Sequence, residues 1–229
     1  MDVRAEREVL RMLNLLWLTY VSFMAAISGA VVPGPVFIVT VSEALKKGKI
    51  AGPLIVVGHL TLEALIIAAL LTGLKTVLSS EVVRTAVGYA GGAALIVMGS
   101  MLMKAAVKFD GSLGLEGNPS GGPGRRLVSH GLVASGILSS GSNPQFYIWW
   151  LTVGLSVMQY CLSSGGISGF AAFILGHASA DLLWFGFVSY SVESGKRLMN
   201  QRVVRFIIVG SALFLILFGA AFIYQTYIY

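Results

Sequence analysis

Six long apolar segments account for most of this 229-residue sequence, in which 56% of the residues are hydrophobic and 11% are charged. Soluble globular domains carry about 25% charged residues, and a helix needs about 20 apolar residues to cross a bilayer. The six segments therefore predict an all-α, polytopic membrane protein with six transmembrane helices. They run approximately over residues 15–41, 51–74, 82–103, 127–157, 167–192 and 203–229.

The basic residues give a formal net charge of +6 and gather near the ends of the apolar segments. This placement is typical of side chains that meet lipid headgroups, and no basic stripe with interleaved aromatics indicates nucleic-acid binding. Eleven of the sixteen Lys and Arg residues lie in or beside the first, third and fifth gaps. Because cytoplasmic loops are enriched in Lys and Arg, we expect a multi-pass plasma-membrane protein with both termini outside the cytoplasm.

The two halves of the sequence repeat each other in order. PGPVFIVT in the first segment matches SNPQFYIW in the fourth, VGHLTLEAL in the second matches LGHASADLL in the fifth, and a Val-Val-Arg opens both the third and the sixth. Residues 1–107 and 127–229 are therefore predicted to be three-helix repeats, joined by a Gly/Pro-rich cytoplasmic loop over residues 108–126. Because three is an odd number of spans, the second copy must enter the membrane from the opposite side, which is an inverted-topology repeat.

Helix-breaking residues interrupt the first and fourth segments at matching places. They are Pro33, Gly34 and Pro35 in the first segment, and Asn143 and Pro144 in the fourth. Proline removes an amide donor from a helix, so we expect the carbonyls of Gly29, Val31 and Ser140 to be released from helical bonding. Such groups are tolerated at membrane depth where they line a wet cavity, although prolines also kink membrane helices for packing alone. The matching breaks predict a substrate cavity with broken helices one and four.

Two Gly-His-x-x-x-acid phrases place an ionisable pair in each half. His59 precedes Glu63, and His177 precedes Asp181, by the four residues that stack side chains on one helix face. Charged groups at bilayer depth are expensive and usually functional, and burial and an adjacent imidazolium act in opposite senses on a carboxylate's proton affinity. We therefore predict that the four residues couple transport to protons or cations. Two alternatives stay open, namely satisfied structural pairs and a divalent metal site built from both pairs.

An aromatic cluster follows the second break, and small residues mark other segments. Phe146 and Tyr147 are assigned to a wall of the substrate cavity, with helix packing or a membrane-interface belt as the alternative for the aromatic cluster as a whole. Gly88 and Gly92 have the spacing that brings helices into close contact. Those contacts are expected either within one chain or between the chains of a homo-oligomer.

These features together resemble the LysE/RhtB-type amino-acid exporter family, the LysE family translocators. The resemblance covers nearly the whole chain. It depends on the six spans, the Pro-Gly-Pro of the first segment, the Asn-Pro of the fourth and the Lys-Lys-Gly-Lys turn over residues 46–49. It implies export of amino acids or related small metabolites, driven by a proton or other ion gradient. The pair formed by His59 and Glu63 is less typical of that family, which keeps divalent metal cations among the candidate substrates.

The resulting prediction is a secondary active transporter that works by alternating access and is coupled to protons. Its partners are a small-molecule substrate and the lipid bilayer, with no nucleic acid, and we assign it no cofactor and no resident metal. A divalent metal exporter is the alternative within transport. A membrane-embedded metal-dependent enzyme is less favoured, because the sequence has no HExxH helix, no serine nucleophile motif and no phosphate-binding loop.

Overall fold

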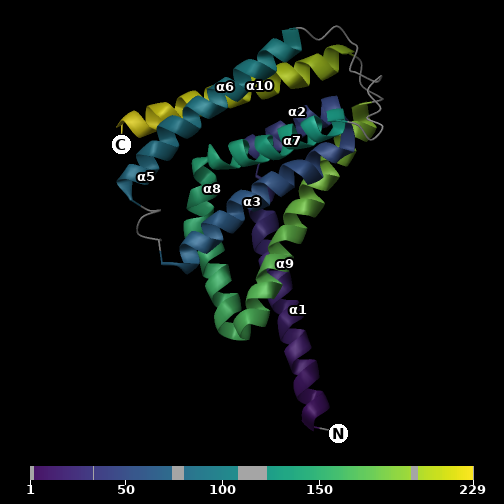
Figure 1. Ribbon diagram of the computed structural model, residues 1–229, viewed down its shortest axis with the longest axis vertical. Helices are drawn as coiled ribbons and strands as arrows, with labels where there is room; N and C mark the ends of the chain where they lie inside the picture. The colour runs from purple at the N-terminus through teal and green to yellow at the C-terminus, as the bar shows by residue number, and fades with distance from the viewer. Residues whose placement is uncertain (1–2, 33, 74–79, 108–122, 197–200, 229) are drawn as a thin grey trace. The chain divides into compact units, whose positions relative to one another are not determined.

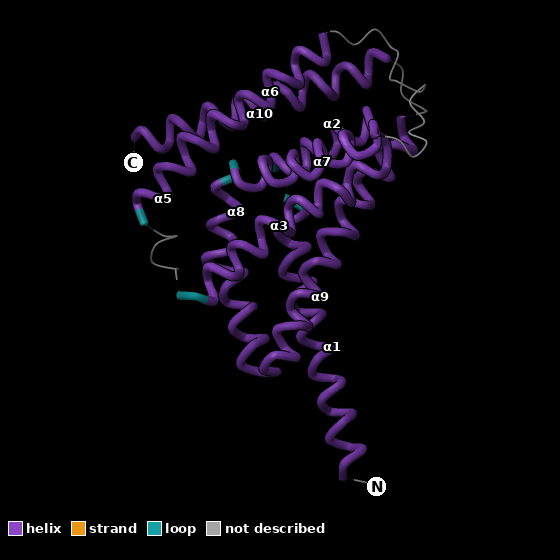
Figure 2. The backbone as a smooth tube through the Cα atoms, in the orientation of Figure 1, coloured by secondary structure: helices purple, strands orange, loops and turns teal. Residues whose placement is uncertain are grey.

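The computed structural model describes residues 3–32, 34–73, 80–107, 123–196 and 201–228, and all regular structure in those ranges is helical (Figure 2). The all-α prediction is confirmed for this part of the chain. In chain order the elements are α1 (Val3–Ala30), α2 (Pro35–Lys47), the 3₁₀ turn η1 (Gly48–Ile50), α3 (Ala51–Leu71), α5 (Glu81–Ala86), the π-helical turn η2 (Val87–Gly91), α6 (Gly92–Val107), α7 (Pro123–Gly141), α8 (Pro144–Trp149), the π-helical turn η3 (Trp150–Gly154), α9 (Leu155–Lys196) and α10 (Gln201–Ile228).

Four helical stretches in the described ranges are long and apolar enough to cross a membrane. They are Arg4–Ala30, Pro35–Leu71, Gln145–Gly195 and Arg205–Ile228. Two further apolar helices, Gly88–Met101 and Gly131–Gly141, are shorter than a full span. The 51 residues of Gln145–Gly195 exceed twice the length of about 20 residues that crosses a bilayer. The fold is therefore that of a helical membrane protein, while the count of six spans stays a prediction.

Both predicted helix breaks are present. Helix α1 ends at Ala30 before α2 begins at Pro35, and α7 ends at Gly141 before α8 begins at Pro144. Helix α1 also begins at Val3 instead of near residue 15, because the charged residues that precede the apolar segment are good helix formers. Pro33 lies outside the described residues, as do residues 108–122 of the predicted cytoplasmic loop.

The expectation that the breaks release the carbonyls of Gly29 and Ser140 was wrong. The amide of Val32 donates to the Gly29 carbonyl at 3.2 Å, and the amide of Asn143 donates to the Ser140 carbonyl at 3.1 Å. Both are tight i→i+3 bonds of the kind that close the last turn of a helix before the chain leaves it. Release of a carbonyl stays a prediction for Val31.

The helices form two compact units, and each unit draws on both halves of the sequence. The first unit comprises Met1–Val32 and Ile148–Trp184. Within it the chain reverses direction at Gly166 (Figure 1), whose φ of 57° lies in the left-handed region that glycine adopts without strain. Helix α1 packs along the arm that follows this turn, with Arg11 bonded to Ser168 and Ser22 bonded to the carbonyl of Phe173. The two helices therefore run parallel.

The second unit comprises Pro33–Tyr147 and Phe185–Tyr229. Helices α3 and α7 pack together in it and run parallel, since Ile55 meets Gly136 and His59 meets Ser140. Helices α6 and α10 lie side by side (Figure 1) and run antiparallel, because Gly88 meets Thr226 whereas Gly99 meets Ile216. Their small residues allow the two backbones to approach closely.

Candidate functional site: two buried histidine–carboxylate pairs

The first predicted pair lies on α3 in the second unit. His59 Nε2 is 3.1 Å from Glu63 Oε1. The side chains are 12% and 5% exposed, so both groups are withdrawn from bulk solvent. The prediction that a four-residue spacing stacks imidazole and carboxylate on one helix face is confirmed here.

A serine and two phenylalanines surround the His59 ring. His59 Nδ1 lies 2.7 Å from the hydroxyl oxygen of Ser140 on α7. The rings of Phe146 and Phe185 contact the imidazole edge-on, with centroid separations of 5.6 and 6.4 Å. One nitrogen of the imidazole therefore contacts a hydroxyl and the other contacts a carboxylate. Two uncharged rings pack against the imidazole as well.

A glycine contact places His59 beside α7. The backbone at Gly58 approaches α7 so closely that a Cβ atom at this position would collide with the carbonyl of Val133. The reciprocal contact at Gly136 would bring a Cβ atom into the carbonyl of Ile55. Since no side chains separate the two backbones, the residue after Gly58 reaches across to Ser140.

The second predicted pair lies on α9 in the first unit. His177 Nε2 is 3.4 Å from Asp181 Oδ2, and the two side chains are 6% and 4% exposed. The predicted spacing again produces a buried pair on one helix face. The two pairs thus belong to different compact units.

Aromatic rings enclose His177. The ring centroids of Trp149, Trp150 and Phe173 lie 5.3, 5.1 and 5.7 Å from that of His177. Trp150 is 1% exposed. It therefore packs in the protein interior and does not belong to a membrane-interface belt. The π-helical turn η3 begins at Trp150, and such turns often occur at functional sites.

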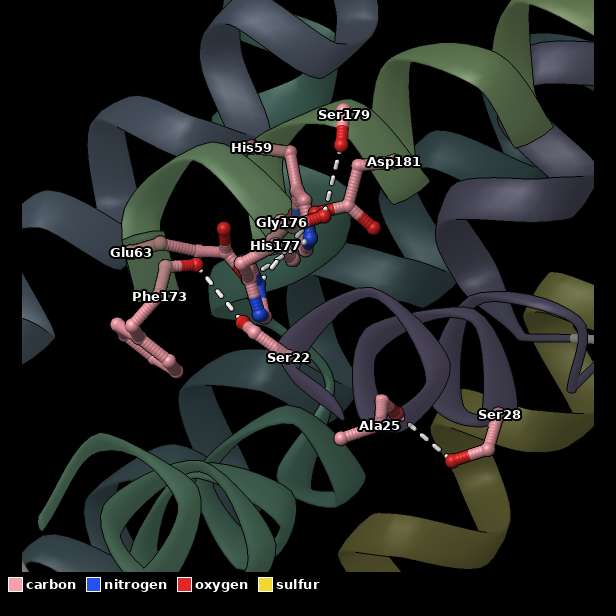
Figure 3. Close-up of polar contacts among 11 residues, drawn as sticks. Ser22, Ala25, Ser28, His59, Glu63, Phe173, Gly176, His177, Ser179 and Asp181 are labelled. Carbon is pink, nitrogen blue, oxygen red and sulfur yellow. Dashed lines mark hydrogen bonds and ion pairs between the residues drawn. The ribbon is translucent and has the colours of Figure 1, made fainter. Parts of the chain in front are cut away.

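The glycine before His177 repeats the contact made by the glycine before His59. A Cβ atom at Gly176 would collide with the carbonyl of Thr19 on α1 and lie 2.9 Å from Cβ of Ser22. Ser22 itself donates to the carbonyl of Phe173 at 2.7 Å (Figure 3). In each pair, the glycine before the histidine therefore brings its helix into backbone contact with a helix that ends at a break. This helix is α7 for His59 and α1 for His177.

The residues of the second break cap helix ends. Asn143 Oδ1 accepts a bond from the amide of Gln145 at 3.1 Å, as an N-cap residue does at the start of a helix. The hydroxyl of Tyr147 donates to the carbonyl of Gly141 at 3.0 Å, which satisfies an acceptor at the end of α7. Phe146 is buried and contacts both His59 and Tyr147. The structure thus brings Phe146 to the first pair, while Pro144 is the first residue of α8.

The first break has a different construction. Gly34 is the N-cap residue of α2 in an extended conformation, with no side-chain cap, and Pro35 follows it as a buried residue in the first turn. Proline suits this position because its missing N–H has no helical partner there. The role of Gly34 and Pro35 in a substrate cavity stays a prediction.

Sequence reasoning missed Ser140 and Phe185 as neighbours of His59. Both come from helices far from His59 in the sequence, so no local spacing indicates them. Ser140 does carry one signal, since it is a fully buried hydroxyl in an apolar helix, and buried polar groups at membrane depth need partners.

Comparison with known proteins assigns a family. The family model of the LysE type translocator matches residues 27–226, which is most of the chain and includes both pairs and both breaks. No curated protein and no solved structure matches the sequence.

Proposed function

Because the chain belongs to the LysE type translocator family, we propose that it is a secondary transporter that exports amino acids or related small metabolites from the cell. Protons move in the opposite direction and drive the export. Membership of the family supports transport in general. The buried pairs within the two units are the reason to propose protons as the coupling ion.

The observation that carries proton coupling is a buried imidazole–carboxylate pair inside apolar helices of each unit. A charged group at the centre of a bilayer costs about 3 kcal/mol on insertion scales, so a helix that needs only to span the membrane gains nothing from one. A histidine and a carboxylate in contact exchange a proton at modest energetic cost, since each tunes the other. The pairs of His59 with Glu63 and His177 with Asp181 supply that chemistry.

The directions of the helices support the inverted three-plus-three repeat. In such a repeat the first and fifth segments run the same way, the second and fourth run the same way, and the third and sixth run oppositely. The contacts of α1 with α9 are parallel, those of α3 with α7 are parallel, and those of α6 with α10 are antiparallel. A repeat inserted twice in the same orientation reverses all three of these relations. Alternating access by inverted repeats is a common transporter mechanism.

We assign substrate recognition to the two helix breaks. The first turn of α2 presents the backbone N–H groups of Val36 and Phe37, since Pro35 itself has none, and such groups at a helix start suit a substrate carboxylate. Asn143, Pro144, Phe146 and Tyr147 shape the second break. The asparagine amide and the aromatic rings suit the ammonium group and side chain of an amino acid. The bias of Lys and Arg toward the first, third and fifth gaps supports placing both chain termini outside the cytoplasm.

Flux from proteoliposomes tests the proposal. The purified protein is reconstituted, the vesicles are loaded in turn with a panel of radiolabelled amino acids, and efflux is measured with and without an imposed pH gradient. We expect efflux of at least one amino acid to accelerate when the gradient favours proton entry, and a proton ionophore to remove the acceleration. Efflux that ignores the gradient contradicts proton coupling, and zinc efflux with none of any amino acid favours the metal exporter.

A further inference from the structure

The hydroxyl of Ser140 lies within hydrogen-bond distance of two groups, a backbone carbonyl and an imidazole nitrogen. It is 2.7 Å from the carbonyl oxygen of Gly136, one turn earlier on α7, and 2.7 Å from His59 Nδ1. A serine hydroxyl has one hydrogen to donate and lone pairs to accept with. A carbonyl oxygen accepts only, so the hydrogen of Ser140 goes to Gly136 if both short contacts are hydrogen bonds.

The second contact then fixes the tautomer of His59. With its hydrogen donated to Gly136, Ser140 can only accept from His59, so Nδ1 must carry a hydrogen. The reverse arrangement leaves two acceptors facing each other at 2.7 Å, which is unfavourable. Which imidazole nitrogen is protonated is set by the bond that the other one makes, and here the serine sets it.

The fixed tautomer determines what lies between His59 and Glu63. A neutral His59 with hydrogen on Nδ1 presents a bare Nε2 lone pair to Glu63 Oε1 at 3.1 Å. Two acceptors at that distance repel each other unless one proton lies between them, either on Nε2 beside a carboxylate or on Oε1 beside a neutral imidazole. From this geometry we infer that Ser140 is a positioning residue that makes the closed pair a one-proton site. The inference rests on the proposed proton coupling for its role in transport.

The closed pair takes up and releases a single proton. On uptake, an O–H bond of a hydronium ion breaks, a water molecule leaves, and the proton forms a bond to the lone pair of Nε2 or Oε1 and closes the pair. On release, that N–H or O–H bond breaks, a water molecule takes the proton and becomes hydronium, and the two acceptors separate. Within the unit, the other elements packed on His59 contribute the hydroxyl of Ser140 and the uncharged rings of Phe146 and Phe185. Tyr147 packs on Phe146 and donates to Gly141. Glu63 is therefore the carboxylate partner of His59 in this unit.

Histidine nitrogen NMR tests the tautomer directly. The chain has three histidines, His59, His130 and His177, so protein labelled with ¹⁵N-histidine gives few signals, and those that disappear in His59→Asn belong to His59. We expect His59 in the wild type to keep hydrogen on Nδ1 at every pH, with only Nε2 titrating. A neutral His59 with hydrogen on Nε2 overturns the inference.

Substitution of the serine supplies the functional measurement, with a matched control in the neighbouring residue. Ser139 is also buried on α7, and its hydroxyl lies 3.3 Å from the same Gly136 carbonyl. We expect Ser140→Ala to mix the tautomers of His59 and to shift the pH profile of flux, while Ser139→Ala leaves both unchanged and Ser140→Thr restores both. An unchanged tautomer and pH profile in Ser140→Ala contradicts the inference. If wild-type flux ignores pH, proton coupling fails, and the NMR result still decides the role of Ser140.

Discussion

The regions around His59 and His177 begin from the same local phrase and end in different surroundings. In the first, a serine hydroxyl holds the second imidazole nitrogen and the nitrogen–carboxylate distance is 3.1 Å. In the second, two tryptophans and a phenylalanine enclose the imidazole and the corresponding distance is 3.4 Å. The spacing within the helix makes the pair, while the elements packed against it determine which side chains surround the imidazole.

The largest expected effect comes from removing either carboxylate. We expect Glu63→Gln and Asp181→Asn each to abolish flux driven by a pH gradient, because each removes the acidic member of its pair while keeping its shape. Efflux from proteoliposomes measures this. Glu43→Gln is the matched control, since Glu43 is a carboxylate on α2 that pairs with Lys46 and Lys47 instead of a histidine. A loss confined to one carboxylate variant contradicts the functional equivalence of the two regions.

Loss of an aromatic ring is expected to reduce stability in both regions, and more so around His177. Trp150→Ala removes a fully buried ring and should lower the free energy of unfolding by about 3–5 kcal/mol. Phe146→Ala removes a smaller ring beside His59 and should cost less. Thermal unfolding in detergent measures both, with the exposed Trp17→Ala as a control near zero. A smaller loss of unfolding free energy in Trp150→Ala than in Phe146→Ala contradicts the expectation that aromatic rings contribute more to stability around His177 than around His59.

The glycine contacts provide a comparison in which the two regions should behave alike. We expect Gly58→Ala and Gly176→Ala each to destabilise the protein by about 1–3 kcal/mol, because the added methyl meets a backbone carbonyl and forces the helices apart. Gly186→Ala on α9 meets nothing within 4 Å and should be neutral or stabilising by about 1 kcal/mol. Tolerance of alanine at residue 58 or 176 means that the backbones are not in contact there.

The smallest expected effect concerns the two breaks. Asn143→Ala removes the side-chain cap of α8 and should cost about 1 kcal/mol of unfolding free energy, whereas Asn143→Ser keeps a capping oxygen and should cost less. Gly34→Ala removes no cap, because α2 has none from a side chain. Denaturation of the three variants in the same detergent compares them. Equal stability of Asn143→Ala and the wild type excludes a capping role for this asparagine.

Local rules predicted the features that depend on neighbours in the sequence. Proline and glycine chemistry located both breaks, and the helical period paired His59 with Glu63 and His177 with Asp181. The same rules failed for Ser140, because its contact with His59 arises from packing between helices 81 positions apart. They also failed for the carbonyls of Gly29 and Ser140, since a helix end can tighten to an i→i+3 bond instead of leaving its last acceptors exposed.

The close approach at Gly58 has a mechanical consequence. Helices usually slide past one another because the side chains between them change rotamer, whereas backbones in direct contact have nothing to rearrange. We therefore expect helices α3 and α7 to move as one rigid body and to carry the imidazole and its serine together in the proposed transport cycle. We then expect a conformational change to be absorbed where the described chain departs from regular helix, and residues 31–32, residues 142–143 and the Gly166 turn are such places.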